Sequence, residues 1–106
     1  FRKMNDKLLG LLGIARRGSN LAIGFEMCSE AVEKNRAKLI IVASDTAQRT
    51  EKELKFKTNG KDIEVVRISA DKYSLSRAIG TSAGAVALCD EGFAKRASEL
   101  INQGGN

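Results

Sequence analysis

Apolar residues recur along the chain in two alternating patterns: stripes with helical spacing and short continuous runs. The first stripe has the three- and four-residue spacing of an amphipathic helix and comprises Leu8, Leu11, Leu12 and Ala15. Asn5 or Asp6 is predicted to cap this helix at its start. Arg16 and Arg17 suit the negative end of its dipole, and Gly18 is predicted to end it in the left-handed conformation.

A short strand over residues 20–23 and a helix from about Gly24 to Asn35 are predicted next. The residues expected on the buried side of this helix are Phe25, Cys28, Ala31 and Val32. Glu26, Glu30 and Glu33 are expected on its opposite side. Residues 38–43 (KLIIVA) then form a continuous apolar run of strand length, which is typical of a strand covered on both faces.

Polar capping and turn-forming residues separate the predicted elements in the second half of the chain in the same way. Ser44-Asp45-Thr46 is predicted to cap a third, basic helix over about residues 46–58, which stops at Asn59-Gly60. A strand over residues 62–68 follows. Asp71 is predicted to cap a short helix ending at Gly80, and Asp90 to cap the last helix, after an uncharged strand over residues 84–89.

Helix and strand therefore alternate throughout, and this order predicts a fold of the α/β class. We expect a three-layer α/β/α sandwich with a small, about four-stranded mixed sheet. A chain of 106 residues holds one core, so residues 4–104 are predicted to form a single domain. Residues 1–3 precede Met4, and an expression remnant and an upstream start are both open explanations for them.

The composition indicates in which cellular compartment such a domain works. Apolar residues make up 42% of the chain and charged residues 29%, as in ordinary globular proteins. No apolar run approaches the roughly 20 residues of a membrane span, and the N-terminus lacks the pattern of a signal peptide. The two cysteines, Cys28 and Cys89, have no CxxC spacing and are expected to be buried thiols. These features favour a cytoplasmic protein without a membrane partner.

The sequence offers no set of catalytic residues. It contains no histidine, which is the commonest general base and zinc ligand. Asp45, Asp71 and Asp90 each follow a predicted strand, where a helix cap explains them better than a paired carboxylate does. The sequence therefore predicts a protein that is not an enzyme and that holds neither a cofactor nor a metal.

The net charge of +5 is unevenly distributed. Residues 1–17 hold five Lys/Arg and one Asp/Glu (net +4), and residues 34–61 hold eight and three (net +5). Between them, residues 18–33 hold three Glu and no cation (net −3), and residues 62–106 have a net charge of −1 from five and six. Two basic blocks flanking an acidic helix start indicate a polarised surface that can attract nucleic acid.

Three features are candidates for contacting a polyanion. Gly24 lies at a predicted helix start, where free N–H groups and a positive dipole end meet an open backbone. Residues 79–85 (IGTSAGA) join a helix to a strand through small and hydroxyl-bearing residues. Lys72 begins the fourth helix. Recognition by exposed aromatic residues on strands is not predicted, because Phe25, Phe56 and Phe93 are expected to be buried.

Longer segments of the sequence resemble a known family. The stretches RAKLIIVASD and RAIG…AVALCDEGFA, within a similarity that runs from Met4 to Leu100, resemble the kink-turn-binding ribosomal protein superfamily of the archaeal and eukaryotic large subunit. Within that superfamily they resemble the bacterial YlxQ-type members most. The resemblance implies an α/β/α sandwich that grips a sharply bent RNA duplex. The helix after the first strand would enter the widened major groove, and the loop before the last strand would pack on an extruded nucleotide.

The resemblance also assigns an RNA-binding set. Gly24 corresponds to the glycine that lets the RNA backbone approach, and Lys72 to a lysine near the extruded nucleotide. The implied set comprises Gly24, Phe25, Glu26, Met27, Glu30, Lys38, Lys72, Ile79, Gly80, Thr81, Ser82, Ala83 and Gly84. The implied partner is a structured RNA, either ribosomal or another kink-turn-like RNA.

Two residues depart from the family pattern. Glu26 and Glu30 stand where binding members usually place an amide or basic residue and a lysine. A carboxylate can accept hydrogen bonds from cytosine or guanine amino groups, so Glu26 is compatible with base reading. The alternative is a protein–protein interaction module of the same fold that has lost kink-turn binding and presents Glu26, Glu30 and Glu33 to a basic partner.

Overall fold

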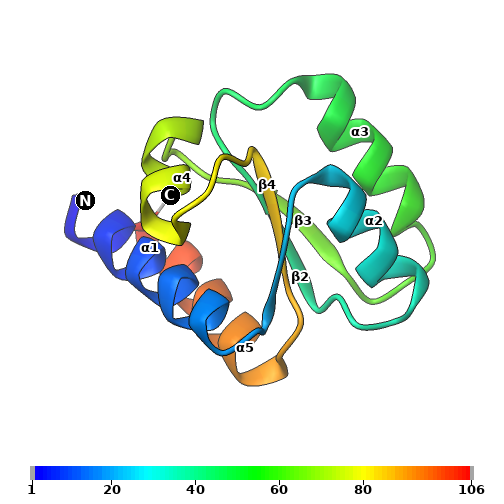
Figure 1. The fold of residues 1–106 in the computed structure, drawn as a ribbon, viewed down its shortest axis with the longest axis horizontal. Coiled ribbons are helices and arrows are strands. Elements are labelled where there is room, and N and C mark those ends of the chain that lie inside the picture. The colour runs from blue at the N-terminus through cyan, green and yellow to red at the C-terminus, as the bar shows by residue number, and fades with distance from the viewer. Residues whose placement is uncertain (1, 106) are drawn as a thin grey trace.

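The computed structural model describes the backbone of residues 2–105 and the side chains of residues 6–103, so Phe1 lies outside the described residues. The predicted alternation of helices and strands is confirmed (Figure 1). The elements are α1 (Arg2–Arg17), β1 (Leu21–Ile23), α2 (Phe25–Glu33), β2 (Leu39–Val42), α3 (Gln48–Lys57), β3 (Glu64–Arg67), α4 (Lys72–Ile79), β4 (Ala85–Leu88), α5 (Glu91–Leu100) and a final π-helical turn, η1 (Ile101–Gly105).

The four strands form one mixed sheet in the order β1-β4-β2-β3. The central strand β4 is antiparallel to both β1 and β2, and it pairs Ala85 with Val42 at one end and Leu88 with Leu39 at the other. β2 and β3 are parallel, so Val42 lies beside Arg67. All residues of β2 and β4 are buried, as expected for apolar strands covered on both faces.

Helices cover the two faces of the sheet, and the predicted α/β/α sandwich is confirmed. In Figure 1, α1, α4 and α5 lie on one side of the strands, and α2 and α3 lie on the other. The alternation of side chains along β2 divides the core accordingly. Leu39 and Ile41 pack in the cluster beneath α1, α4 and α5, whereas Ile40 and Val42 pack in the cluster beneath α2 and α3.

The predicted start of the first helix and its left-handed stop residue are wrong, whereas its predicted last turn, with Arg16 and Arg17, is confirmed. α1 begins at Arg2, so Asn5 and Asp6 lie inside the helix and do not cap it. At its other end Ser19, with φ 61°, takes the left-handed conformation that was expected of Gly18. The N–H of Asn20 donates to the carbonyl of Ala15 at 2.8 Å, so the closing turn runs through Ser19 and not Gly18.

Two of the three predicted aspartate caps are confirmed. The Asp71 side chain accepts a hydrogen bond from the N–H of Ser74 (2.8 Å), and that of Asp90 accepts one from the N–H of Phe93 (2.9 Å). The cap predicted at Ser44-Asp45-Thr46 is wrong, because α3 begins after Ala47 without a side-chain cap. The last residue of α3 is Lys57, which precedes the predicted Asn59-Gly60 stop. The side chains of Asp45 and Thr46 instead bond to distant segments at the candidate site.

The burial predicted for one aromatic residue is also wrong. Phe25 and Phe93 are half-buried, but Phe56 is 81% exposed, and Tyr73 is 68% exposed. α3 buries Leu54 alone. Because Phe56 follows only two positions later, it projects from a different side of the helix.

The strand directions bring the connections together at two ends of the sheet. We define the upper end as Gly24 and the loops 43–47, 68–71 and 80–84, which all meet at the top of the sheet in Figure 1. We define the lower end as the connections 34–38, 58–63 and 89–90. Gly24 and residues 80–84 of the predicted RNA-binding set lie at the upper end, and Phe25, Lys72 and Ile79 directly adjoin it.

Candidate nucleic-acid interface

The start of α2 is joined directly to the end of the 80–84 loop. The N–H of Gly24 donates to the carbonyl of Ala85 at 2.8 Å. This bond continues the β1–β4 ladder by one residue, so the glycine is held beside the strand that leaves the loop. Two of the three predicted candidate features are therefore neighbours.

Gly24 has a conformation that favours glycine. Its φ of 92° and ψ of 162° fall in a region that side-chain-bearing residues essentially never occupy. A Cβ at this position would have no atom within 4 Å, so the space in front of the residue is open. No side chain caps α2, and the first N–H groups of a helix have no partner within it. The helix start thus offers donors and a positive dipole end to an approaching anion.

The side chains of the first α2 turns are exposed and acidic. Glu26 is exposed, and Met27 is 45% exposed. Glu30 forms an ion pair with Lys34 at 2.7 Å, and the hydrogen bond from Lys34 lowers the pKa of this carboxyl group. The cation one turn further along offsets the charge of Glu30, so Glu30 repels a phosphate less than an unpaired carboxylate would.

The 80–84 loop is anchored at both ends. Gly80 ends α4 with φ 80°, as predicted. The N–H of Ala83 donates to Ser76 Oγ at 3.0 Å, and Ser76 Oγ lies 3.3 Å from the Ala83 carbonyl. Ile79 and Ala83 are buried, whereas Gly80, Thr81 and Ser82 are exposed. The buried Ile79 and Ala83 therefore fix the loop to the core, and the small, partly hydroxyl-bearing residues between them face solvent.

Gly84 lies under two side chains, one from the 43–47 loop and one from the first residue of α4. Thr46 Oγ1 donates to the Gly84 carbonyl at 2.6 Å. A Cβ on Gly84 would come within 2.9 Å of Thr46 Oγ1 and 3.0 Å of Lys72 Cδ, so only glycine fits without displacing a neighbour. The backbone N–H of Lys72 donates to Asp45 Oδ1 at 2.8 Å. These contacts place Lys72 against the loop and account for the polar residues that do not cap α3.

Arg67 organises this end of the sheet, and the sequence reasoning missed it. Its Nη1 donates to the carbonyls of Ala43 (3.0 Å), Ser44 (2.9 Å) and Thr46 (2.7 Å). Its Nε and Nη2 contact Glu51 at 2.8 and 2.7 Å. Hydrogen bonds from Lys55 and Arg67 lower the pKa of Glu51 and keep it ionised. An arginine within the otherwise apolar stretch VVRI was the available signal.

A second cation, Arg16, also lies at this surface. A Cβ built on Gly80 would lie 3.5 Å from Arg16 Nη1, so the guanidinium borders the loop. The sequence explains this arginine by the dipole of α1, in whose last turn it lies. Helical position alone could not reveal that the last turn of α1 meets the end of α4.

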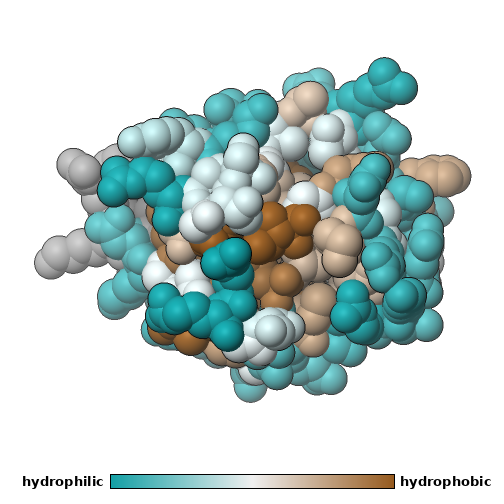
Figure 2. All heavy atoms as spheres, in the orientation of Figure 1, coloured by the Kyte–Doolittle hydropathy of each residue, from teal (hydrophilic) through white to brown (hydrophobic). Residues whose placement is uncertain are grey.

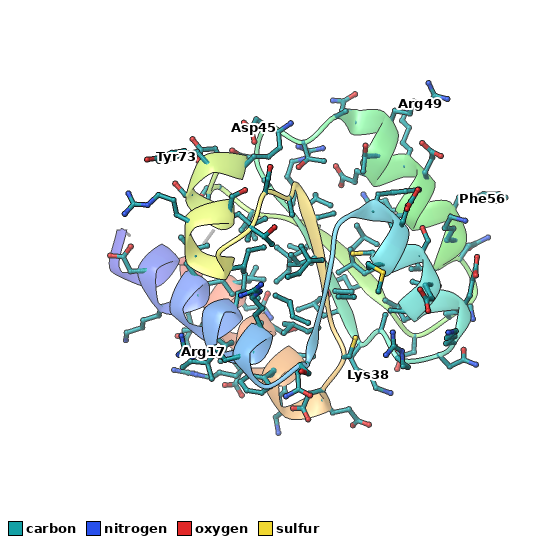
Figure 3. The ribbon with its side chains drawn as sticks, in the orientation of Figure 1. Arg17, Lys38, Asp45, Arg49, Phe56 and Tyr73 are labelled. Carbon is teal, nitrogen blue, oxygen red and sulfur yellow. The ribbon has the colours of Figure 1, made fainter. Side chains whose placement is uncertain are left out.

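Lys38 is separated from the other residues of the predicted set. Its N–H donates to the carbonyl of Leu88 at 2.7 Å, at the lower end of β4. About 15 Å of extended chain separates it from the upper end. Figure 3 shows Lys38 below the sheet and Asp45 above it.

Hydrophobic atoms lie at the centre of the face that these features border. Figure 2 shows them between α4 and β1, surrounded by hydrophilic residues. The half-buried Leu21 and Ile23 belong to β1, an edge strand of the sheet. An apolar centre with polar and cationic residues around it is suited to a flat partner such as a base.

Other chemistry has little support in the part of the chain that is described. Between residues 2 and 105 no group of three or more Cys, Asp or Glu side chains is placed to hold a metal ion. No helix within that range is long and apolar enough to cross a membrane. Burial raises the pKa of Cys28 to about 12, so this thiol remains protonated at neutral pH.

Comparison with known proteins defines the class. A profile of the Ribosomal protein L7Ae/L30e/S12e/Gadd45 family matches residues 6–98, and the chain belongs to this family. It is 28% identical over 96 residues to the RNA-binding protein YlxQ of Enterococcus faecium, with 91% of this chain and 92% of the relative covered. It is 29% identical over 93 residues to the RNA-binding protein YlxQ of Bacillus subtilis (strain 168), with 87% and 92% covered.

Solved structures agree with this assignment. A protein of unknown function from Bacillus halodurans C superposes with a TM-score of 0.84 at 33% identity, with 91% of this chain and 97% of that chain covered. The 15.5kD RNA binding protein of Giardia lamblia superposes with a TM-score of 0.75 at 19% identity, with 97% and 88% covered. The second match, at its low identity, supports the fold alone.

Proposed function

We propose that this chain is a non-catalytic RNA-binding protein that holds a sharply bent, kink-turn-like RNA at the upper end of its sheet. The observation that carries the proposal is the hydrogen bond between Gly24 and Ala85, which holds the uncapped start of α2 beside the 80–84 loop. The two YlxQ relatives are named as RNA-binding proteins, which supports the same ligand class.

The start of α2 would contact the backbone and base edges of the RNA. Its N–H groups donate to phosphate oxygens, and the open space at Gly24 allows close approach. The exposed carboxylate of Glu26 can accept from the amino groups of cytosine or guanine. The phosphate contacts of the N–H groups would position the RNA, and the base contact of Glu26 would read its sequence.

The 80–84 loop would receive a nucleotide extruded from the bend. Thr81 and Ser82 are exposed and small, so a flat base can lie against the loop and bond to its hydroxyl groups. Lys72 and Arg16 border the loop and supply positive charge for the flanking phosphates. The bonds from Ser76 and Thr46 hold the loop in place before RNA arrives, which lowers the entropic cost of binding.

A titration against two RNAs tests this proposal. The protein would be titrated with a kink-turn RNA and with a straight duplex of the same length, each at 50 mM and 150 mM salt. We expect a clear preference for the kinked RNA and a steep loss of affinity with salt. Lys72→Gln should lower the affinity, whereas Lys95→Gln, an exposed lysine on α5, is the matched control. Equal, weak, salt-erased binding to both RNAs would contradict the proposal.

One observation favours the alternative of a protein–protein interaction module. Met27 is 45% exposed beside the exposed Glu26, and Glu33 is exposed on the same helix. An apolar residue among carboxylates suits a basic protein surface. Retention of such a partner on immobilised protein, with no preference between the two RNAs, would favour this alternative.

A further inference from the structure

α3 carries an aromatic residue that neither the core nor the proposed site uses. Phe56 is 81% exposed, the most exposed of the large hydrophobic side chains in the described part of the chain. Figure 3 shows it projecting from the outer side of α3, and Figure 2 shows a hydrophobic projection among hydrophilic residues at that edge. A single exposed apolar residue is ordinary, but an aromatic ring bordered by cations on one helix face has the chemistry to bind a flat, anionic ligand.

The surroundings of Phe56 form an open, mainly cationic hollow of about 580 Å³. The side chains that line it recur at helical spacing on one face of α3. They are Gln48, Arg49, Lys52, Glu53, Phe56 and Lys57. Three cations face one carboxylate, a net charge of +2, and Glu53 lies 3.6 Å from Arg49. The α3 face, as we name these six residues, therefore attracts an anionic partner.

The α3 face begins next to the proposed RNA site. The loop that leads into α3 contains Thr46, which bonds to Gly84 of the 80–84 loop. α2 and α3 pack against each other, and Figure 1 shows both helices starting near the upper end of the sheet. From Gln48, the helix carries the face about 12 Å to Phe56, in the direction of the lower end of the sheet (Figure 1). A strand that leaves the upper end can reach it.

We propose that the α3 face binds a single-stranded segment that flanks the bent RNA, with a base stacked on Phe56 and phosphates near Lys52 and Lys57. This inference rests on the proposed function, because the flanking strand is delivered by the RNA held at the upper end. A phenylalanine between lysines is the combination by which proteins hold single strands without sequence preference: the ring stacks on any base, and the cations follow the backbone. A carboxylate-rich protein segment would use the cations but not the flat face of the ring.

The test compares three RNAs by fluorescence anisotropy. The first kind is the kinked stem alone. The second kind carries six uridines on one of the four strand ends, with each end tested in turn. The third kind carries six abasic residues at the same end. The uridine and abasic extensions have the same charge and differ only in the bases. We expect one uridine extension to tighten binding about tenfold, and the abasic extension to do so less.

Phe56→Ala should remove most of the gain from the uridines and leave the stem and the abasic RNA unaffected. Tyr73→Ala is the matched control, because Tyr73 is also exposed but lies on α4, away from this face in Figure 3. Lys52→Gln and Lys57→Gln should each lower the salt slope of the extended RNA by about 0.7. Glu53→Gln should tighten binding, since it frees Arg49 from its ion pair.

Phe56→Trp supplies a direct readout, because the chain contains no other tryptophan. Its fluorescence should be quenched by the uridine extension and remain unchanged with the abasic one. Unquenched tryptophan at saturating extended RNA, or the same affinity for stem and extended RNA at every end, would overturn the inference. If the stem itself is not bound, the proposed function fails separately, and quenching by free hexauridine then decides whether the α3 face binds a single strand.

Discussion

The two ends of the sheet are built from the same kinds of connection but are fixed in different ways. At the upper end, the Arg67 guanidinium bonds three carbonyls, Thr46 bonds Gly84, and Gly24 bonds Ala85. At the lower end, the longest-range side-chain contacts are those of the exposed Lys61, which lies 3.1 Å from Asn35 Oδ1 and 3.4 Å from the Val32 carbonyl. Both ends therefore have contacts between distant segments, but several residues make them at the upper end, whereas one exposed lysine makes these side-chain contacts at the lower end.

Charges are placed differently around the two ends. The hollow at the lower end is lined by Lys38, Lys61, Asp62 and Glu91, whose charges cancel. The 80–84 loop itself holds no charged residue, and the cations Lys72 and Arg16 border it. A pre-positioned loop with cations beside it is suited to a polyanion.

The largest expected difference between the two ends is in the stability contributed by Arg67 at the upper end and by Lys61 at the lower end. Arg67→Met would remove the guanidinium from three carbonyls and from Glu51, which keeps its ion pair with Lys55, and we expect it to lower the free energy of unfolding by about 3 kcal/mol. Lys61→Met, the matched change at the lower end, should cost less than about 1 kcal/mol, because its contacts are exposed. Urea unfolding of both variants measures the two values. Equal losses would remove the distinction between the ends.

The second difference concerns two glycines with positive φ. Gly24→Ala and Gly60→Ala each place a side chain in open space at a φ of 92° and 81°, so each should cost about 1–3 kcal/mol of stability through backbone strain. Only Gly24→Ala should also weaken kink-turn RNA binding, by at least about tenfold, because its methyl group blocks the approach to α2. Anisotropy titration of both variants separates binding from stability. Comparable weakening by Gly60→Ala would show that strain alone reduces binding.

A smaller difference is expected within α2. Glu26→Lys, at the start of α2, removes the base-reading carboxylate but should raise the affinity for kinked and straight RNA alike about fivefold at low salt, since it replaces repulsion by attraction near the phosphates. Glu33→Lys, at the other end of the same helix, should change it little. Titration at 50 mM and 150 mM salt checks both. If the chain instead serves a basic protein partner, both substitutions should weaken that interaction and neither should alter RNA binding in this way.

The smallest effect concerns the N-cap of α4, which carries Lys72 into the site. The hydrogen bond from the Ser74 N–H lowers the pKa of Asp71 below its ordinary value of 3.8. Because the folded-state pKa is depressed, the stabilising contribution is complete well above pH 3.8 and is lost as the pH falls through the folded-state value. Asp71→Asn should therefore lose slightly less stability than the wild type between pH 5 and pH 2.5, measured by thermal unfolding. An identical acid loss would contradict this role.

Local pattern was sufficient to predict the fold, and it failed where partners are distant in sequence. The buried runs LIIV and AVAL and the caps Asp71 and Asp90 depend on neighbours within a few residues, and they were predicted correctly. Thr46 and Asp45 looked like caps, but their partners lie 38 and 27 positions away. No spacing rule identifies such bonds before the strand order is known.

For the candidate site, too, residues at element boundaries could be predicted, and residues brought in by tertiary packing could not. Gly24, Lys72 and the 80–84 loop stand at element boundaries, where open backbone is visible in the sequence. Arg67 and Arg16 were missed as parts of the site, because only the sheet order brings Arg67 to the upper end and only the α1–α4 packing brings the Arg16 guanidinium beside Gly80. The exposure of Phe56 was missed because a phenylalanine in a helix usually packs inward.

Amide chemical shifts map the RNA contact most directly. Uniformly labelled protein would be titrated with an unextended kink-turn RNA, and the shifts of every backbone N–H would be followed. We expect the largest changes on Phe25, Glu26, Met27 and the exposed residues of the 80–84 loop, with Asn35, Lys38 and Lys61 unchanged. Changes centred on the lower end of the sheet, with the start of α2 unaffected, would contradict it.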